Sequence, residues 1–159
     1  MTNKKYLIAE LLCVAALITF IVLICVSRSG GTDKKISDVA APVVKTMAKN
    51  QMTKKTNADA VKAFKLDLSL TDGVVYYANN NVMDVSELLI VKLKDKSDAP
   101  DLKEKVDLRV SEQKKLYKSY APKQYSLLEN SITETSGNVL FYCTAENAVS
   151  LFEKFKEAL

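Results

Sequence analysis

The feature that most constrains this chain is a long apolar run near its start, at residues 7–26. An α-helix of these twenty residues would be about 30 Å long, which matches the hydrocarbon core of a bilayer. Thirteen of them are Leu, Ile, Val or Phe, and each favours insertion by about 0.3–0.6 kcal/mol, whereas the single charge, Glu10, costs about 3 kcal/mol. We therefore predict a single transmembrane helix whose first partner is the membrane lipid bilayer.

The flanks of this helix suggest how the rest of the chain is arranged. A cleaved secretory signal has an apolar core of about 7–15 residues, so a retained signal anchor is the better interpretation, although Ser27 and Ser29 leave cleavage open. Basic residues are nearly balanced across the helix, and the short basic start favours an N-terminus inside the cell. We predict a cytoplasmic segment at 1–6, a tether at 27–35 and an extracytoplasmic domain at 36–159, on the plasma membrane.

The charge of the domain argues against nucleic acid as a partner. Residues 1–31 hold three of the 23 basic and one of the 19 acidic residues, which leaves a net charge of +2 for the remainder. Its lysine pairs are scattered among acidic residues, whereas a nucleic-acid surface needs a basic face. Only Arg28 and Arg109 are arginine, a composition typical of AT-rich genomes and thus of low-GC Gram-positive bacteria.

The absence of histidine removes much of enzyme chemistry from consideration. Ser-His-Asp and Cys-His catalysis and histidine-based metal sites all require an imidazole. Cys143 is the only cysteine beyond the predicted helix, and its apolar neighbours indicate a buried small hydrophobe. Ser111 and Lys114 form an S-x-x-K string, but no companion motif accompanies it. We predict a protein that is not an enzyme and that has no cofactor and no metal site.

The apolar periodicities of the domain predict an α+β fold. An antiparallel sheet of about four strands with helices packed on a face follows from the order α-α-β-β-α-β-β-α. The expected helices lie at 36–51, from Asn57 onward, at 98–120 and at 145–159, and the expected strands lie at 74–78, 85–93, within 125–135 and at 139–143. The 85–93 run is typical of a central strand. Pro42 suggests that the regular part of the first helix begins only there.

Two groups of side chains are candidates for an interaction surface. The run Asn79, Asn80 and Asn81 follows a strand and could contact a ligand, although its commoner role is to tolerate positive φ in a turn and satisfy its own backbone. Tyr117 and Tyr120 could form a recognition patch, although their helical spacing also fits packing at the core or its rim.

Several segments of the last ninety residues resemble a known family. They are Ser86–Glu87 with the apolar run into Lys92–Asp95, the string Gln113–Tyr120 continuing through Pro122, Gln124, Tyr125 and Leu128–Asn130, and Gly137–Tyr142. Together they are similar to the domain-of-unknown-function family numbered 4358, from Firmicutes. The resemblance implies a secreted, anchored protein, often with a lipid-attachment cysteine that this chain lacks in proper form, and it supplies no activity.

These observations leave three functional hypotheses. We favour a membrane-anchored interaction module of the bacterial cell envelope, whose partner is another envelope protein or a cell-wall component, and which should carry an exposed apolar or tyrosine-rich patch. The alternative is a sensor of a small ligand or peptide, which requires a concave pocket with converging polar groups near residues 79–81. An enzyme that uses carboxylates, or Ser111 with Lys114, comes last.

Overall fold

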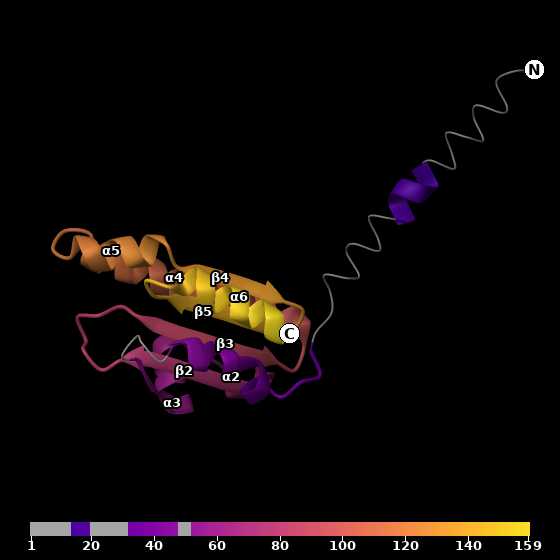
Figure 1. The fold of residues 1–159 in the computed structure, drawn as a ribbon, viewed down its shortest axis with the longest axis horizontal. Helices are drawn as coiled ribbons and strands as arrows, with labels where there is room; N and C mark the ends of the chain where they lie inside the picture. Colours follow the sequence, from indigo (N-terminus) through magenta and orange to yellow (C-terminus); the bar gives the residue numbers. More distant parts are fainter. Residues whose placement is uncertain (1–13, 20–31, 48–51) are drawn as a thin grey trace, which may run out of the picture. The chain divides into compact units, whose positions relative to one another are not determined.

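The computed structural model of the protein describes residues 14–19, 32–47 and 52–159. Residues 14–19 are helical and belong to one compact unit, residues 1–30, whereas residues 31–159 form a second unit (Figure 1). Within the described ranges, no helix has both the length and the apolar character needed to cross a bilayer. Most of the predicted span at 7–26 lies outside the described residues, so the transmembrane helix stays a prediction.

The domain in residues 31–159 is an α+β fold with a five-stranded antiparallel sheet, as the sequence predicted in class. Its helices are α2 (Ile36–Met47), α3 (Asn57–Phe64), α4 (Ala99–Tyr117), α5 (Pro122–Glu129) and α6 (Ala148–Ala158), with short 3-10 turns at Leu68–Leu70 and Lys96–Asp98. Its strands are β1 (Met52–Lys54), β2 (Thr71–Asn79), β3 (Glu87–Leu93), β4 (Ile132–Ser136) and β5 (Val139–Thr144), in the spatial order β1-β2-β3-β5-β4.

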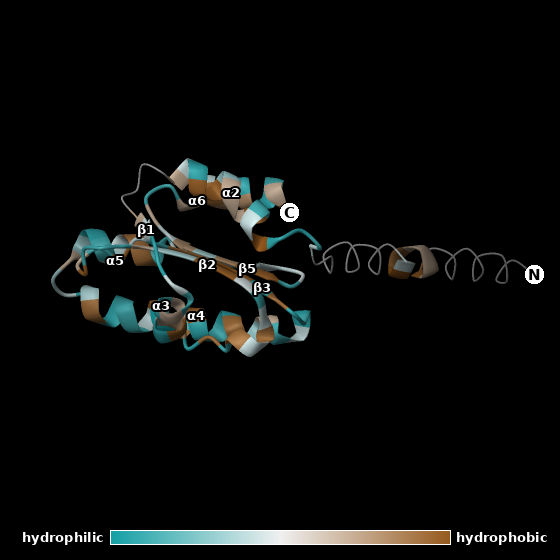
Figure 2. Ribbon diagram, turned by 90° about the horizontal axis from the view of Figure 1, so that it is seen from below, coloured by the Kyte–Doolittle hydropathy of each residue, from teal (hydrophilic) through white to brown (hydrophobic). Residues whose placement is uncertain are grey.

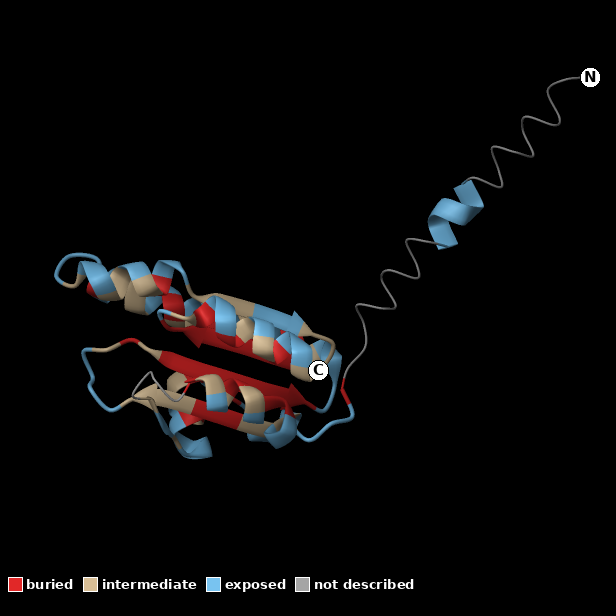
Figure 3. Cartoon of the chain, viewed as in Figure 1, coloured by how far each residue is buried: buried red, intermediate tan, exposed pale blue. Residues whose placement is uncertain are grey.

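Strand β3 is the centre of the sheet, which confirms the prediction from its apolar run. All seven of its residues are buried, and it pairs with β2 on one side and β5 on the other (Figure 3). In this register Leu89 lies opposite both Tyr76 and Tyr142. Because successive side chains of a strand point to opposite faces, β3 contributes Leu88 and Ile90 to one hydrophobic core and Leu89 to the other.

Helices cover both faces of the sheet, not one face as the sequence analysis expected (Figure 2). Helices α2 and α6 pack on one face with Val39, Val43 and Phe155, and α3 and α4 pack on the other with Phe64 and Val106. We call these the α2/α6 face and the α3/α4 face. Because helices cover both faces, β3 has apolar side chains on both of its sides.

Two segments differ from the predicted elements. The fifth strand, β1, was missed because its three residues are too few to show a period. The strand expected within 125–135 is confined to β4, because Pro122 begins the additional helix α5, which buries Leu128. The helix expected at 98–120 accordingly ends at Tyr117.

Pro42 lies inside α2 and does not mark its start. The helix begins at Ile36, and Asp38 and Val39 donate backbone hydrogen bonds to Lys35 in its first turn. Val39 and Val43 are completely buried against the sheet. Their packing therefore holds the first turns in place despite the hydrogen bond that proline removes.

The chain reaches the domain at the turn between β4 and β5. Gly137 there has a φ of 58°, in the left-handed region, and Asn138 follows it. The Asn138 side chain accepts a hydrogen bond from the Thr32 backbone N–H at 3.2 Å and donates one to the Leu93 carbonyl at 3.0 Å. Residues 32–35, which the sequence analysis assigned to a tether, therefore lie against the end of the sheet where β3 finishes.

Candidate functional site

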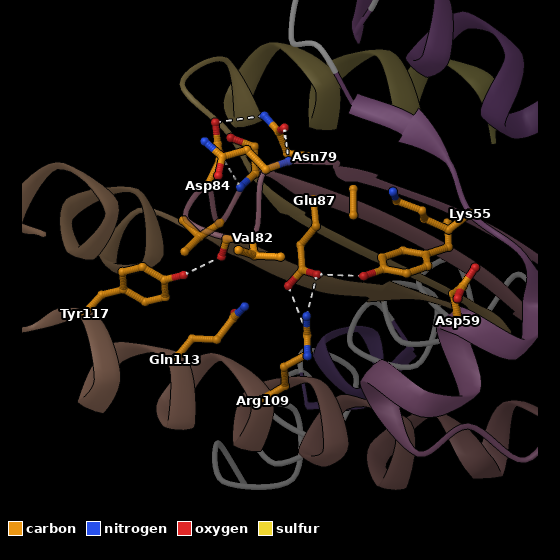
Figure 4. Close-up of a pocket in the computed structure, with 14 residues that line it drawn as sticks. Lys55, Asp59, Asn79, Val82, Asp84, Glu87, Arg109, Gln113 and Tyr117 are labelled. Carbon is orange, nitrogen blue, oxygen red and sulfur yellow. Dashed lines mark hydrogen bonds and ion pairs between the residues drawn. The ribbon is translucent and has the colours of Figure 1, made fainter.

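A pocket of about 350 Å³ lies on the α3/α4 face, at the end of the sheet where β2 finishes and β3 begins (Figure 4). Of the five sequence-predicted residues, Asn79, Asn81 and Tyr117 line it. Asn80 and Tyr120 lie outside its lining, although each contacts a lining residue. The pocket thus brings together two predicted groups that are far apart in the sequence.

The floor of the pocket is a buried carboxylate that is fully engaged. Glu87 has 2% of its surface exposed and receives two hydrogen bonds from Arg109, at 3.1 Å from Nε and 3.0 Å from Nη2. The hydroxyls of Tyr76 and Tyr142 donate to the same carboxylate at 3.0 and 2.9 Å. Thr144 in turn donates to the Tyr142 hydroxyl at 2.8 Å. We call these five residues the Glu87 network.

Aromatic packing fixes the geometry of this network. The Arg109 guanidinium lies 4.9 Å from the centre of the Phe64 ring, and it also donates to the Ala63 carbonyl at 3.3 Å. Phe64 packs edge-on against Tyr76 and Tyr142 at 5.3 and 5.7 Å. A planar guanidinium suits both a carboxylate and an aromatic face, which lysine cannot match.

The Glu87 carboxylate raises the pKa of its neighbours in the network. Burial acts to lower the pKa of Arg109, but the adjacent Glu87 carboxylate outweighs burial, so the net shift of this pKa is upward. Burial first, and then the charge of Glu87, raise the pKa of both Tyr76 and Tyr142. Both tyrosines therefore remain neutral hydrogen-bond donors at any physiological pH.

One wall of the pocket is the loop at residues 80–86, which we call the asparagine loop. Asn79 Oδ1 accepts from the Asn81 N–H at 2.9 Å, and Asn81 Oδ1 accepts from the Met83 N–H at 3.0 Å. Asn79 Nδ2 also donates to Asp84 at 2.9 Å. None of the three asparagines has a positive φ, so the tolerance expected from the sequence is not used. The side chains of Asn79 and Asn81 satisfy the loop backbone, which is the other half of that expected role, whereas Asn80 accepts hydrogen bonds from the side chains of Thr53 and Lys55.

The rim of the pocket is apolar and exposed. Val82 and Met83, at the tip of the asparagine loop, are 87% and 51% exposed. The hydroxyl of Tyr117 donates to the Val82 carbonyl at 3.0 Å, which joins α4 to the loop. The rings of Tyr117 and Tyr120 lie 5.4 Å apart, and Tyr120 is 57% exposed while Tyr117 is buried. Tyr117 therefore packs at the edge of the core, and Tyr120 extends the exposed rim.

Gln113 supplies unused hydrogen-bonding capacity. Its side chain extends from α4 into the pocket (Figure 4), and its Oε1 is buried without a hydrogen-bond partner among the described residues. An unpaired buried acceptor costs about 1–3 kcal/mol. A bound group that donates to this amide, or that lets it turn, would remove that cost.

The candidate nucleophiles lie elsewhere. Ser111 and Lys114 line a separate groove between α4 and β4, and no hydrogen bond joins them within the described residues. Burial, followed by the charge of Glu87, raises the pKa of Cys143 to about 12, so this thiol stays protonated. In the described part of the chain, no group of three or more Cys, Asp or Glu side chains is arranged to hold a metal ion.

Sequence reasoning missed the residues at the centre of the pocket, Glu87, Arg109 and Gln113. Two signals point to the first pair. Glu87 is an acidic residue at the start of the predicted central strand, and Arg109 is the only arginine of the domain among many lysines. A buried charge requires a partner, and arginine is the residue that supplies one with two parallel hydrogen bonds. Nothing in the sequence distinguishes Gln113 from other polar residues of α4.

The fold and the pocket define a three-layer α+β domain that carries a buried glutamate, paired with a half-buried arginine, under an exposed loop. The chain matches the family model of DUF4358, a domain of unknown function, over residues 45–145. It belongs to this family, as the resemblance of its last ninety residues indicated. None of the curated proteins and none of the solved structures compared with it matches.

Proposed function

We propose that the protein is a membrane-anchored, extracytoplasmic interaction module of the bacterial cell envelope. The end of the domain that carries the asparagine loop would recognise another envelope protein or a cell-wall component. The observation that carries this proposal is the exposed apolar rim, Val82 and Met83, above a pocket with polar walls. Exposed apolar side chains bordered by polar groups are typical of interaction sites.

The rim lies far, within the domain, from the residues by which the chain enters it. Within the domain, β3 begins at the pocket with Glu87 and ends at Leu93, where Asn138 holds the incoming chain at Thr32. The rim and the point of attachment are thus at opposite ends of the sheet.

The proposal of an anchor rests on the apolar run at 7–26. In its described part, residues 14–19, the helix exposes Val14, Leu17 and Ile18, by 51–62%. Exposed aliphatic side chains around a helix are stabilised by lipid and disfavoured in water. Proteolysis of intact protoplasts that carry a C-terminally tagged chain tests the topology. Loss of the tag without lysis is expected, and protection until lysis would contradict an outside domain.

Site-specific photo-crosslinking in living cells tests the recognition surface. A benzophenone amino acid at Val82 should give a discrete adduct with one partner, because this side chain is 87% exposed at the rim. The same group at Val149 on α6, which is 67% exposed, is the matched control. Equal adducts from both positions, or none from Val82, would count against the proposal.

A sensor of a small ligand is the second candidate, and the volume of the pocket favours it. A cavity of about 350 Å³ is within the range of small-molecule sites, and Asn79, Asp84 and Gln113 converge on it. A panel of free amino acids and dipeptides should then raise the unfolding temperature of the chain, and Gln113→Leu should abolish the shift. No shift with any member of the panel, together with a Val82 adduct, would leave the interaction module as the function.

A further inference from the structure

Strands β1 and β4 are the two edges of the sheet. Strand β4 leaves backbone hydrogen-bonding groups without partners among the described residues. Opposite residues of an antiparallel pair alternate between hydrogen-bonded and non-hydrogen-bonded positions. Ser136 and Val139 flank the two-residue turn and therefore form a hydrogen-bonded pair. Counting back along β4, Thr133 and Thr135 turn their N–H and C=O groups away from β5.

The contacts of Thr133 agree with this orientation. Its carbonyl accepts a hydrogen bond from Lys103 Nζ at 2.9 Å, across the open edge from α4. Among the described residues, no other hydrogen bond reaches the outward backbone groups of Thr133 or Thr135. Lysine is common at open sheet edges, where it disfavours pairing with other chains. Here Lys103 binds one of the four outward groups, which are the N–H and C=O of Thr133 and of Thr135.

A groove of about 560 Å³ runs beside this edge, between α4 and β4. Lys103, Ser111 and Lys114 form its helical wall, and Thr133 and Glu134 form its strand wall. An added strand lies about 4.8 Å from its neighbour, and alternate side chains need space on each face of the sheet. The groove supplies that space on the α4 side.

Charge identifies the occupant that this edge accepts. Glu134 is exposed at the middle of β4 and has no ion-pair partner among the described residues. Like charges directly opposite each other on neighbouring strands are destabilising, and opposite charges are stabilising. A second copy of the chain, paired about the middle of β4, would place Glu134 opposite Glu134 and is disfavoured. We propose that β4 accepts an extended segment of a partner protein as a sixth strand, with a lysine or arginine opposite Glu134.

Peptide binding to the full chain, purified in a mild detergent, tests the proposal. The probe is the acetylated, amidated heptapeptide Ser-Val-Thr-Lys-Thr-Val-Ser, and its matched control has Glu in place of the central Lys. Backbone hydrogen exchange at Thr133 and Thr135 should slow when the Lys peptide binds. The Lys peptide should bind about three- to tenfold more tightly than the Glu peptide, as expected for a cross-strand charge pair.

Two variants separate this interaction from a loss of folding. Glu134→Lys should reverse the preference between the two peptides, an outcome that a misfolded chain cannot give. Thr135→Pro removes an outward N–H at an edge position that tolerates proline, and it should abolish binding of both peptides. Absence of slowed exchange at millimolar peptide, or an unchanged preference in Glu134→Lys, would overturn the proposal. Sedimentation showing a dimer with both amides already protected would overturn it in favour of a second copy.

Discussion

The two faces of the sheet are built by different rules. On the α2/α6 face, Leu88, Ile90 and Phe141 lie in a core of apolar side chains, in which Cys143 behaves as one more small hydrophobe. The charge of Lys92, at the end of β3, is bound there by the exposed Asp72 and the Lys34 carbonyl. The α3/α4 face contains an equally apolar core but also buries a carboxylate, Glu87, with its network of hydrogen bonds at one end.

The difference indicates where the sequence is constrained by more than stability. Removing a carboxylate and a guanidinium from water costs several kcal/mol, and their mutual attraction does not always repay it. A well-packed apolar pair would often be as stable, so the Glu87–Arg109 pair is better explained by its position under the pocket. Its shape and its fixed hydrogen bonds give the pocket a defined floor.

The largest expected effect comes from removing the positive half of this pair. Arg109→Met should lower the free energy of unfolding by about 3–5 kcal/mol, because Glu87 would stay buried with no opposite charge. Urea denaturation measures the loss. Adding Glu87→Gln to this variant should restore most of the stability, since the neutral amide can accept from one tyrosine hydroxyl and donate to the oxygen of the other. A single variant that loses less than about 1 kcal/mol would contradict the assigned role of the pair.

A truncation on the other face sharpens the comparison. Leu151→Ala in α6 should cost about 2–5 kcal/mol, because Leu151 is completely buried and its removal leaves a cavity. Unlike Arg109→Met, this variant should not regain stability from a second substitution that only changes a charge. Val149→Ala, at an exposed position of the same helix, should change the stability by less than about 0.5 kcal/mol. Thermal unfolding of the three chains is the measurement.

A smaller effect is expected from a single hydroxyl of the network. Tyr142→Phe removes one donor to Glu87 and the acceptor for Thr144, and it should cost about 1–3 kcal/mol. Tyr77→Phe is the matched control, because no hydrogen bond of the described residues engages the Tyr77 hydroxyl. Equal stability of the two variants in urea would show that the hydroxyl of Tyr142 contributes nothing.

The smallest effect is a pH dependence on the apolar face. The pKa of Cys143 is raised to about 12 in the folded protein, against an ordinary value of 9.0. The unfolded chain therefore releases a proton above pH 9 that the folded chain retains. The stability contributed by the neutral thiol is complete below this pH and is lost as the pH rises, by about 1.4 kcal/mol per pH unit.

Cys143→Ala should therefore flatten the decline of stability between pH 9 and pH 10, measured by urea denaturation at several pH values. Above pH 10 both chains should still lose stability, since Tyr76 and Tyr142 have raised pKa values and the same sign of dependence. Parallel declines of the two chains between pH 9 and pH 10 would show that Cys143 is not held neutral by the fold.

The sequence predicted the parts of the fold that depend on regular patterns. The 85–93 run identified the central strand, and the 139–143 run identified the strand beside it, because each signal is local. The helix α5 was missed because the segment after Pro122 was assigned to a strand within 125–135. Whether a proline ends one helix or also starts another depends on the burial of Leu128, which is a tertiary property.

The sequence predicted residues in the walls of the pocket but not those at its floor. Asn79, Asn81 and Tyr117 were identified because turn residues and tyrosines are conspicuous in a sequence. Glu87 and Arg109 are 22 positions apart, and their contact depends on how α4 crosses the sheet, which no periodicity encodes. The open edge at β4 was likewise hidden until the strand order was known.

The side chain of Asn138 has a mechanical consequence. It holds the incoming backbone at Thr32 and the last residue of β3, Leu93, at the same time. Tension transmitted along the chain toward residue 32 therefore reaches the turn between β4 and β5 and the end of the central strand together. While the two hydrogen bonds of Asn138 hold, this tension does not reach α2, although α2 is the next helix along the chain.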